Sequence, residues 1–142
     1  MKKIVSLGCI VLLSTLMALV SCATLPNKPI SKSDLPSLKG KWEGQRTTGA
    51  GTAANTDLEI FNDTLPLKGT LTVHNVVTRQ GTPGRTVVHE FQGGTINEAG
   101  NFILKSDQIL FELSLYQGEG KMKLEGDYYY WGFKGKVVFY KK

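Results

Sequence analysis

A five-residue pattern with glycine at its centre recurs along this chain and constrains its fold most strongly. In each copy a large apolar residue, any residue, glycine, any residue and a second apolar residue follow one another. The copies span residues 38–42, 67–71, 124–128 and 133–137, and a looser copy spans 91–96. Glycine inside a strand marks a bend, a bulge or a close approach of two backbones. The irregular spacing argues against a solenoid or propeller, and the pattern favours a small sheet that coils and closes into a barrel.

The sequence after residue 38 has the pattern of successive β-strands. Alternating and β-branched runs recur between Gly, Asn, Asp and Pro, and no segment keeps a helical apolar period for three turns. The expected strands are residues 40–46, 57–61, 69–79, 85–92, 94–96, 102–105, 108–116, 121–130 and 135–140. Short links make successive strands antiparallel neighbours. The sequence therefore predicts an all-β fold, a single small antiparallel up-and-down meander barrel of about eight strands.

The first 22 residues resemble a bacterial lipoprotein signal peptide. Two lysines precede an apolar run that ends in the lipobox Leu19-Val20-Ser21-Cys22, and a basic start before an apolar stretch is typical of secretory signals. The resemblance implies cleavage before Cys22, a diacylglycerol on its thiol and acylation of the new amino group. It implies a lipid anchor in the bacterial cell envelope, and at the outer membrane because Ala23, not aspartate, follows the cysteine. An ordinary signal peptide cut near Ala23 is the alternative.

Three segments follow from this interpretation: a signal peptide at 1–21, an acylated cysteine with a flexible tether at 22–37, and the barrel domain at 38–142. The mature chain has 121 residues, and three of the five prolines fall between residues 23 and 37. That segment has few large apolar residues, so we expect it to be extended and flexible. Cys22 is the one cysteine of the mature chain, which leaves no internal disulfide.

The mature chain is mildly basic, with 15 Lys and Arg against 12 Asp and Glu. Six lysines lie from residue 121 onward, against two acids, Glu125 and Asp127. Such a basic edge can meet anionic lipid or envelope polymer. The alternative is a solvated sheet edge that lysines protect against pairing with a neighbour. Nucleic acid is not an expected partner, because the exported chain has no clustered basic groove.

Gly40-Lys41-Trp42 resembles the Gly-x-Trp opening of the calycin barrels, the lipocalins and avidins. Gly126-Asp127-Tyr128 is similar to a motif late in the lipocalin fold. The resemblance implies that Trp42 packs across the closed end of the barrel beneath a cation from a late strand, with Lys136 as the candidate. Residues 43–47 do not match the avidin biotin-contacting pattern, so the resemblance does not imply biotin binding.

The mature chain lacks the common signatures of catalysis, phosphate binding and zinc binding. We expect no enzymatic activity, no cofactor and no metal. The histidines His74 and His89 are the strongest remaining pair, because pairing Gln80 with Arg85 places both on one face of a hairpin. A register slip of one residue separates them, and the alternative is a pair of half-buried strand histidines.

Alternation along residues 128–131 sends Tyr128 and Tyr130 to one face and Tyr129 and Trp131 to the other. Aromatic side chains with polar tips suit ligand or partner contact. The residues expected to make that contact are Trp42, Tyr128, Tyr130 and Trp131.

The function that the sequence favours is a lipid-anchored binding protein for a small apolar or amphipathic ligand, or for a partner on its aromatic face. The alternative is a structural lipoprotein, such as an envelope assembly factor or a hydrolase inhibitor, that acts through surface loops such as 47–55.

Overall fold

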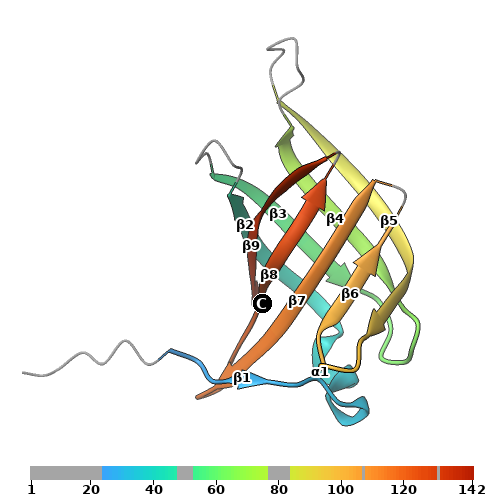
Figure 1. The fold of residues 1–142 in the computed structure, drawn as a ribbon, viewed down its shortest axis with the longest axis vertical. Helices are drawn as coiled ribbons and strands as arrows, with labels where there is room; N and C mark the ends of the chain where they lie inside the picture. Colours follow the sequence, from blue (N-terminus) through green and yellow to red (C-terminus); the bar gives the residue numbers. More distant parts are fainter. Residues whose placement is uncertain (1–23, 48–52, 77–83, 107, 131) are drawn as a thin grey trace, which may run out of the picture.

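The computed structural model describes residues 24–47, 53–76, 84–106, 108–130 and 132–142, and almost all of them belong to one β-barrel. A short strand β1 (Asn27–Lys28), a 3₁₀ turn η1 (Lys32–Asp34) and a short helix α1 (Leu35–Leu38) come first. The barrel strands follow as β2 (Gly40–Thr47), β3 (Ala53–Ile60), β4 (Leu67–Val76), β5 (Arg85–Ile96), β6 (Phe102–Lys105), β7 (Ile109–Gly118), β8 (Lys121–Tyr130) and β9 (Phe133–Lys141). Figure 1 shows them arranged as a closed wall.

The eight strands β2 to β9 each pair antiparallel with the next along the chain, and β9 pairs back onto β2. The closing register runs from Trp42 opposite Lys141 to Thr47 opposite Lys136. The predicted all-β meander barrel is confirmed. The closed eight-stranded wall is also consistent with the calycin-like architecture that the Gly-x-Trp opening implied.

Two predicted strand ranges match the structure at both ends, 102–105 and 121–130. The segments 85–92 and 94–96, predicted as two strands, form the single strand β5, whose pairing with β4 shifts register near Gly94. Over the described residues, β5 pairs with β6 through only two residues, Thr95 and Ile96.

Glycines of the repeated pattern lie where two strands approach too closely for a side chain. A Cβ atom on Gly126 would lie 1.9 Å from the carbonyl oxygen of Glu112 on β7, and one on Gly69 would lie 1.9 Å from that of Glu59 on β3. Side chains cannot be accommodated at such distances without movement of the backbone. Glycines of this pattern therefore lie at close backbone contacts in the barrel wall, and the predicted close approach of strands is confirmed at Gly69 and Gly126.

The barrel interior is filled by apolar side chains at the end that α1 covers (Figure 1). Leu38 of α1 and Trp42 of β2 are both fully buried, and the Trp42 Nε1 donates a hydrogen bond of 2.8 Å to the Leu38 carbonyl oxygen. The ammonium of Lys141 lies 4.9 Å from the centre of the Trp42 ring. Trp42 thus closes this end beneath a cation from the last strand. That cation is Lys141; the candidate Lys136 instead faces outward and pairs with Asp127 at 2.5 Å.

Residues 27–37 are packed on the barrel, so the prediction of a flexible tether through residue 37 is wrong for this part. Asn27 and Lys28 pair with β7, and Ile30 and Leu35 are only 5% and 6% exposed. The Ile30 N–H also donates to the Gly100 carbonyl oxygen at 2.9 Å. Composition suggested too few apolar residues to order this segment. The few that it has, including Ile30 and Leu35, are nevertheless buried in the core of the barrel.

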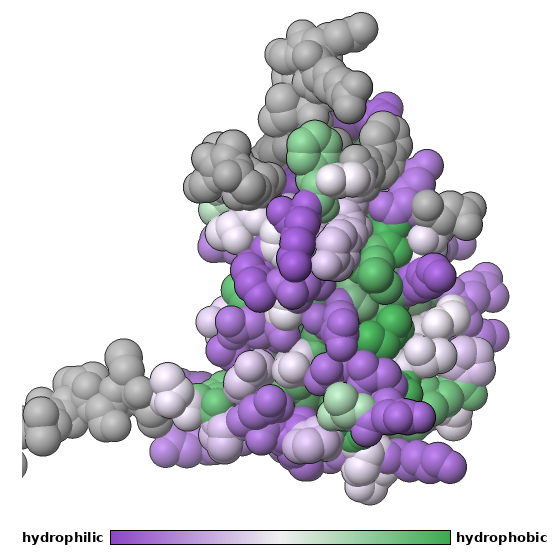
Figure 2. Space-filling view, viewed as in Figure 1, coloured by the Kyte–Doolittle hydropathy of each residue, from purple (hydrophilic) through white to green (hydrophobic). Residues whose placement is uncertain are grey.

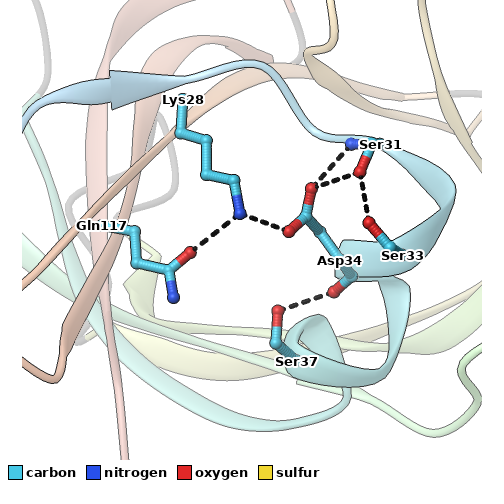
Figure 3. A network of polar contacts seen from close by, with 6 residues as sticks. All are labelled: Lys28, Ser31, Ser33, Asp34, Ser37 and Gln117. Carbon is cyan, nitrogen blue, oxygen red and sulfur yellow. Dashed lines mark hydrogen bonds and ion pairs between the residues drawn. The ribbon is translucent and has the colours of Figure 1, made fainter.

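A polar network around Asp34 fastens the same segment (Figure 3). Lys28 Nζ donates to Asp34 Oδ1 at 2.5 Å, and the backbone N–H and hydroxyl of Ser31 donate to Oδ2 at 2.9 and 2.6 Å. Lys28 also donates to the side chain of Gln117 on β7 at 3.4 Å. These bonds, with the one from Lys28 first, lower the pKa of Asp34 to about 2. We call residues 27–38 the clasp, since they join the amino-terminal chain to β7.

The lysines after residue 121 do not protect a sheet edge, because β8 and β9 are paired on both sides. Most have acidic or aromatic partners in the described structure. Their contacts are Lys123 with Glu125, Lys134 and Lys136 with Asp127, Lys142 with Glu43, and Lys141 with Trp42. The expected basic edge is therefore only partly neutralised, because three acidic residues, Glu43, Glu125 and Asp127, are paired with four of its six lysines.

Candidate ligand site at the barrel mouth

Figure 1 shows the strand ends that lie opposite α1. Several polar side chains occupy inward positions near these ends. We define the barrel mouth as the inward positions Arg46, Ala54, His89 and Tyr130 together with Arg85 at the rim. Tyr128, one step deeper than Tyr130 on β8, is 1% exposed, whereas Tyr130 and His89 are half-buried and Arg85 is exposed. Along β8 and β5, burial therefore decreases from the apolar core toward the mouth.

Arg46 reaches the interior because it alternates with Trp42 along β2. It is only 8% exposed, and its Nε has no hydrogen-bond partner. None of the ion pairs between described residues includes an arginine. The acidic residues of the described strands occupy the outward positions, and Asp57 beside His74 is an example. Arg46 is thus a buried cation for which the described chain supplies no counterion.

Tyr130 and His89 face each other across the mouth. The Tyr130 hydroxyl lies 3.4 Å from His89 Nε2, and the two rings meet edge to face with centres 5.7 Å apart. Burial lowers the pKa of His89, which favours the neutral form of the imidazole. The pair forms a neutral polar surface beside the Arg46 cation.

The pKa of Tyr130 shows how the charges at the mouth are placed. Burial raises this pKa, and the positive charges of Arg46 and Arg85 act in the opposite direction. Both guanidinium groups are therefore within electrostatic range of the phenol. Two cations, a phenol and an imidazole therefore lie at one end of an interior whose other described inward residues are mostly apolar.

The predicted contact residues separate into three groups. Trp42 and Tyr128 are core residues with at most 1% of their surface exposed, because both occupy inward positions in the filled part of the barrel. Both side chains are therefore enclosed in the core. Tyr130 lies at the mouth, while Trp131 and the lipidation candidate Cys22 lie outside the described residues.

Arg46 and Arg85 were missed by sequence reasoning, although a signal for Arg46 was present. Once Trp42 is placed inside, a period of two places Gly44 and Arg46 inside as well. An arginine on the buried face of a strand is uncommon and marks a candidate site. Arg85 carries no comparable signal, because its position depends on the pairing of β5 with β4.

The two histidines lie on opposite faces of the barrel wall, so the predicted shared face is wrong. Leu71, not Val76, is the partner of His89, and the β4 to β5 register shifts between Val73 and Val76. His74 consequently faces outward, 2.9 Å from Asp57 and 3.3 Å from Thr86. No group of three or more metal-ligating side chains occurs among the described residues.

The outer surface offers a second, shallower feature near the upper end of β7. Figure 2 shows hydrophobic atoms grouped over β6 and β7 on a face that is otherwise mostly hydrophilic. A depression of about 500 Å³ is lined by Lys105, Ser106, Gln108, Ile109, Leu110, Tyr129 and Gly132. Tyr129 is 43% exposed, which agrees with the outward orientation predicted from its alternation with Tyr128.

Comparison with known proteins does not add a relative to this picture. No known family model matches the sequence, and no curated protein shows significant similarity to it. Among the helices formed by the described residues, none has the length and apolar character needed to span a bilayer.

Proposed function

We propose that the protein is a lipid-anchored envelope protein that binds a small amphipathic ligand in its barrel mouth. The observation that carries this proposal is the change inside the barrel from an apolar core to an end where Arg46 is buried and His89 and Tyr130 are half-buried. Small-molecule sites have this character, with mostly apolar walls and a few convergent polar side chains. An eight-stranded barrel is wide enough either to be filled by side chains or to hold one small ligand.

The lipid anchor in this proposal is Cys22, on the basis of the lipobox. The clasp begins at Asn27, so only residues 23–26 connect the acylated cysteine to the wall of the barrel. Five residue steps span at most about 17 Å when fully extended. The barrel is therefore held close to the bilayer surface, where amphipathic molecules are concentrated.

Native mass spectrometry of the protein extracted gently from its source envelope tests the proposal. We expect an added mass in the range of a small lipid or amphiphile. A matched pair of variants connects that mass to the mouth. Ala54→Trp fills the mouth from β3 and is expected to abolish the added mass, whereas Ala53→Trp places the same bulk on the outer face and is expected to retain it.

Two results would overturn the proposal. One is a bare protein mass from several gentle extractions, and the other is an added mass that survives Ala54→Trp. Circular dichroism and thermal unfolding of both variants establish that the barrel is intact, so that a lost ligand is not mistaken for a lost fold.

The second candidate function is a structural or inhibitory lipoprotein that acts through its outer surface. The depression beside Tyr129 and the exposed side chains of Phe133 and Tyr140, 60% and 55% exposed, favour it. The loop at 47–55 that the sequence suggested lies mostly outside the described residues. This candidate predicts that Tyr129→Ala abolishes capture of an envelope protein while Ala54→Trp does not.

A further inference from the structure

We propose that the ligand of the barrel mouth carries an anionic head group, a carboxylate or a phosphate, that pairs with the buried guanidinium of Arg46. This inference rests on the proposed function, and it names the chemical class of the ligand. Its basis is an imbalance: Arg46 is 8% exposed with an unpartnered Nε, and no ion pair between described residues includes it.

An arginine cannot relieve this imbalance by losing its proton, because the guanidinium group keeps its charge in proteins. A lysine or histidine in the same place would become neutral, whereas Arg46 stays charged. Buried charges are normally paired or hydrogen-bonded, since desolvation is costly. A cation kept in this position at the expense of stability is typical of a binding group whose partner is not part of the chain.

The surroundings of Arg46 also favour an anion over a neutral or cationic head group. Arg85 adds a second positive charge at the rim, and the electrostatic effect of both arginines reaches Tyr130. No aspartate or glutamate occupies an inward position of the described strands. The Tyr130 hydroxyl can donate a hydrogen bond to a carboxylate or phosphate oxygen. A cationic head group would meet two like charges here.

The apolar part of the ligand is accommodated by neighbouring inward positions. Val73 on β4 and Val87 on β5 are direct partners in the barrel wall, and Val73 is 2% exposed while Val87 is half-buried. Ala54, opposite Arg46 on β3, adds a small side chain beside the guanidinium. A short hydrocarbon tail can lie against these residues while its head group contacts Arg46.

Calorimetric titration of a soluble chain with four probes tests the head group. The chain begins at residue 22 with Cys22→Ala, and it contains every residue that the structure describes. The probes are dodecanoate, dodecyl phosphate, dodecanol and inorganic phosphate. The two ionic amphiphiles are used below their micellar concentrations, and dodecanol is used below its solubility limit. We expect dodecanoate or dodecyl phosphate to bind about tenfold or more tightly than dodecanol, because only the anionic head groups can form charge-assisted hydrogen bonds with Arg46. The stronger of the two anionic amphiphiles identifies the head group, and binding of inorganic phosphate alone identifies a free anion instead.

Arg46→Met, with Lys68→Met as its control, assigns the preference to one side chain. Lys68 lies exposed on the outer face of β4, so its replacement makes the same change in net charge. We expect Arg46→Met to reduce the preference for anions over dodecanol to about twofold or less, while Lys68→Met retains it.

The unliganded stability of Arg46→Met separates a binding role from a structural one. Removing an unpaired buried charge should leave the midpoint of thermal unfolding unchanged or raise it. A large drop in the midpoint would show that Arg46 is structural and would overturn the inference.

The remaining outcomes distinguish this inference from the proposed function. Equal affinity for dodecanoate, dodecyl phosphate and dodecanol would overturn the anionic head group and leave amphiphile binding intact. No binding of any amphiphile would overturn both proposals. Salt provides an independent check. Raising the ionic strength should weaken the binding of the anionic amphiphiles and leave the binding of dodecanol unaffected.

Discussion

The ammonium group of Lys141 lies over the ring of Trp42 at the closed end of the barrel, 4.9 Å from the ring centre. Lys141 also donates a hydrogen bond to the carbonyl oxygen of Lys39, just after α1. These two contacts join β9 to β2 and to the residue that follows α1, the helix at the closed end. Burial lowers the pKa of Lys141, which is the cost of placing a cation in this position.

Replacing Lys141 with methionine should destabilise the barrel, because the cation–π contact and the hydrogen bond to Lys39 are both lost. The expected loss in the free energy of unfolding is about 1 kcal/mol, measured by urea unfolding. Lys136→Met is the control, since that side chain forms an exposed ion pair and should leave stability near that of the wild type. Equal effects of the two substitutions would contradict the role assigned to Lys141.

The Asp34 network should make stability depend on acid pH. The hydrogen bonds from Lys28 and Ser31 hold the Asp34 pKa at about 2, below the unfolded value of about 3.8. The stabilisation is therefore complete above about pH 5 and is lost as the pH falls toward the folded pKa.

Asp34→Asn tests this dependence directly. It should cost about 1 kcal/mol near neutral pH and progressively less as the pH falls, with Asp63→Asn as an exposed control. Hydrogen exchange at residues 27–38 should accelerate in Asp34→Asn alone. A penalty that stays constant from neutral pH down to about 2 would show that the carboxylate is not what holds the clasp.

Gly126→Ala should disrupt the barrel wall. The new methyl group would lie 1.9 Å from the Glu112 carbonyl oxygen, so β7 and β8 must separate. We expect a loss of about 2 kcal/mol or more in the free energy of unfolding. Gly93→Ala is the matched control, because no atom lies within 4 Å of the Cβ that it adds. Similar unfolding curves for the two variants would contradict the close-contact explanation of the glycine pattern.

The lipid anchor can be tested with the two cysteines of the precursor. Cys22→Ala should abolish incorporation of radiolabelled palmitate and release the protein from the membrane fraction. Cys9→Ala should leave both unchanged, since that residue lies within the predicted signal peptide. Continued labelling of Cys22→Ala would contradict the lipobox assignment.

The architecture could be predicted from the sequence because its determinants are local. Alternation and short links defined the strands, and the recurring glycines indicated closure of the wall. The limits appeared where position depends on pairing between distant strands. Nothing in the sequence distinguishes Lys141 from Lys136 as the partner of Trp42 until the β2 to β9 register is known.

The site was harder to predict for the same physical reason. The shift between Val73 and Val76 turned His74 away from His89, and a single sequence does not reveal that irregularity. The clasp was missed because composition averages over a segment, whereas Ile30 and Leu35 are buried individually. The inward position of Arg46 could have been predicted, because side chains alternate along a strand and Arg46 lies four residues after the inward Trp42.

The location of the bound ligand tests the central claim most directly. Backbone amide spectra of the soluble Cys22→Ala chain, recorded during titration with dodecanoate, report which residues the ligand approaches. We predict shifts concentrated at Arg46, Ala54, Val87, His89 and Tyr130, with little change in α1 or around Trp42. Shifts confined to the outer depression beside Leu110 and Tyr129, or the absence of any shift, would contradict ligand binding at the barrel mouth.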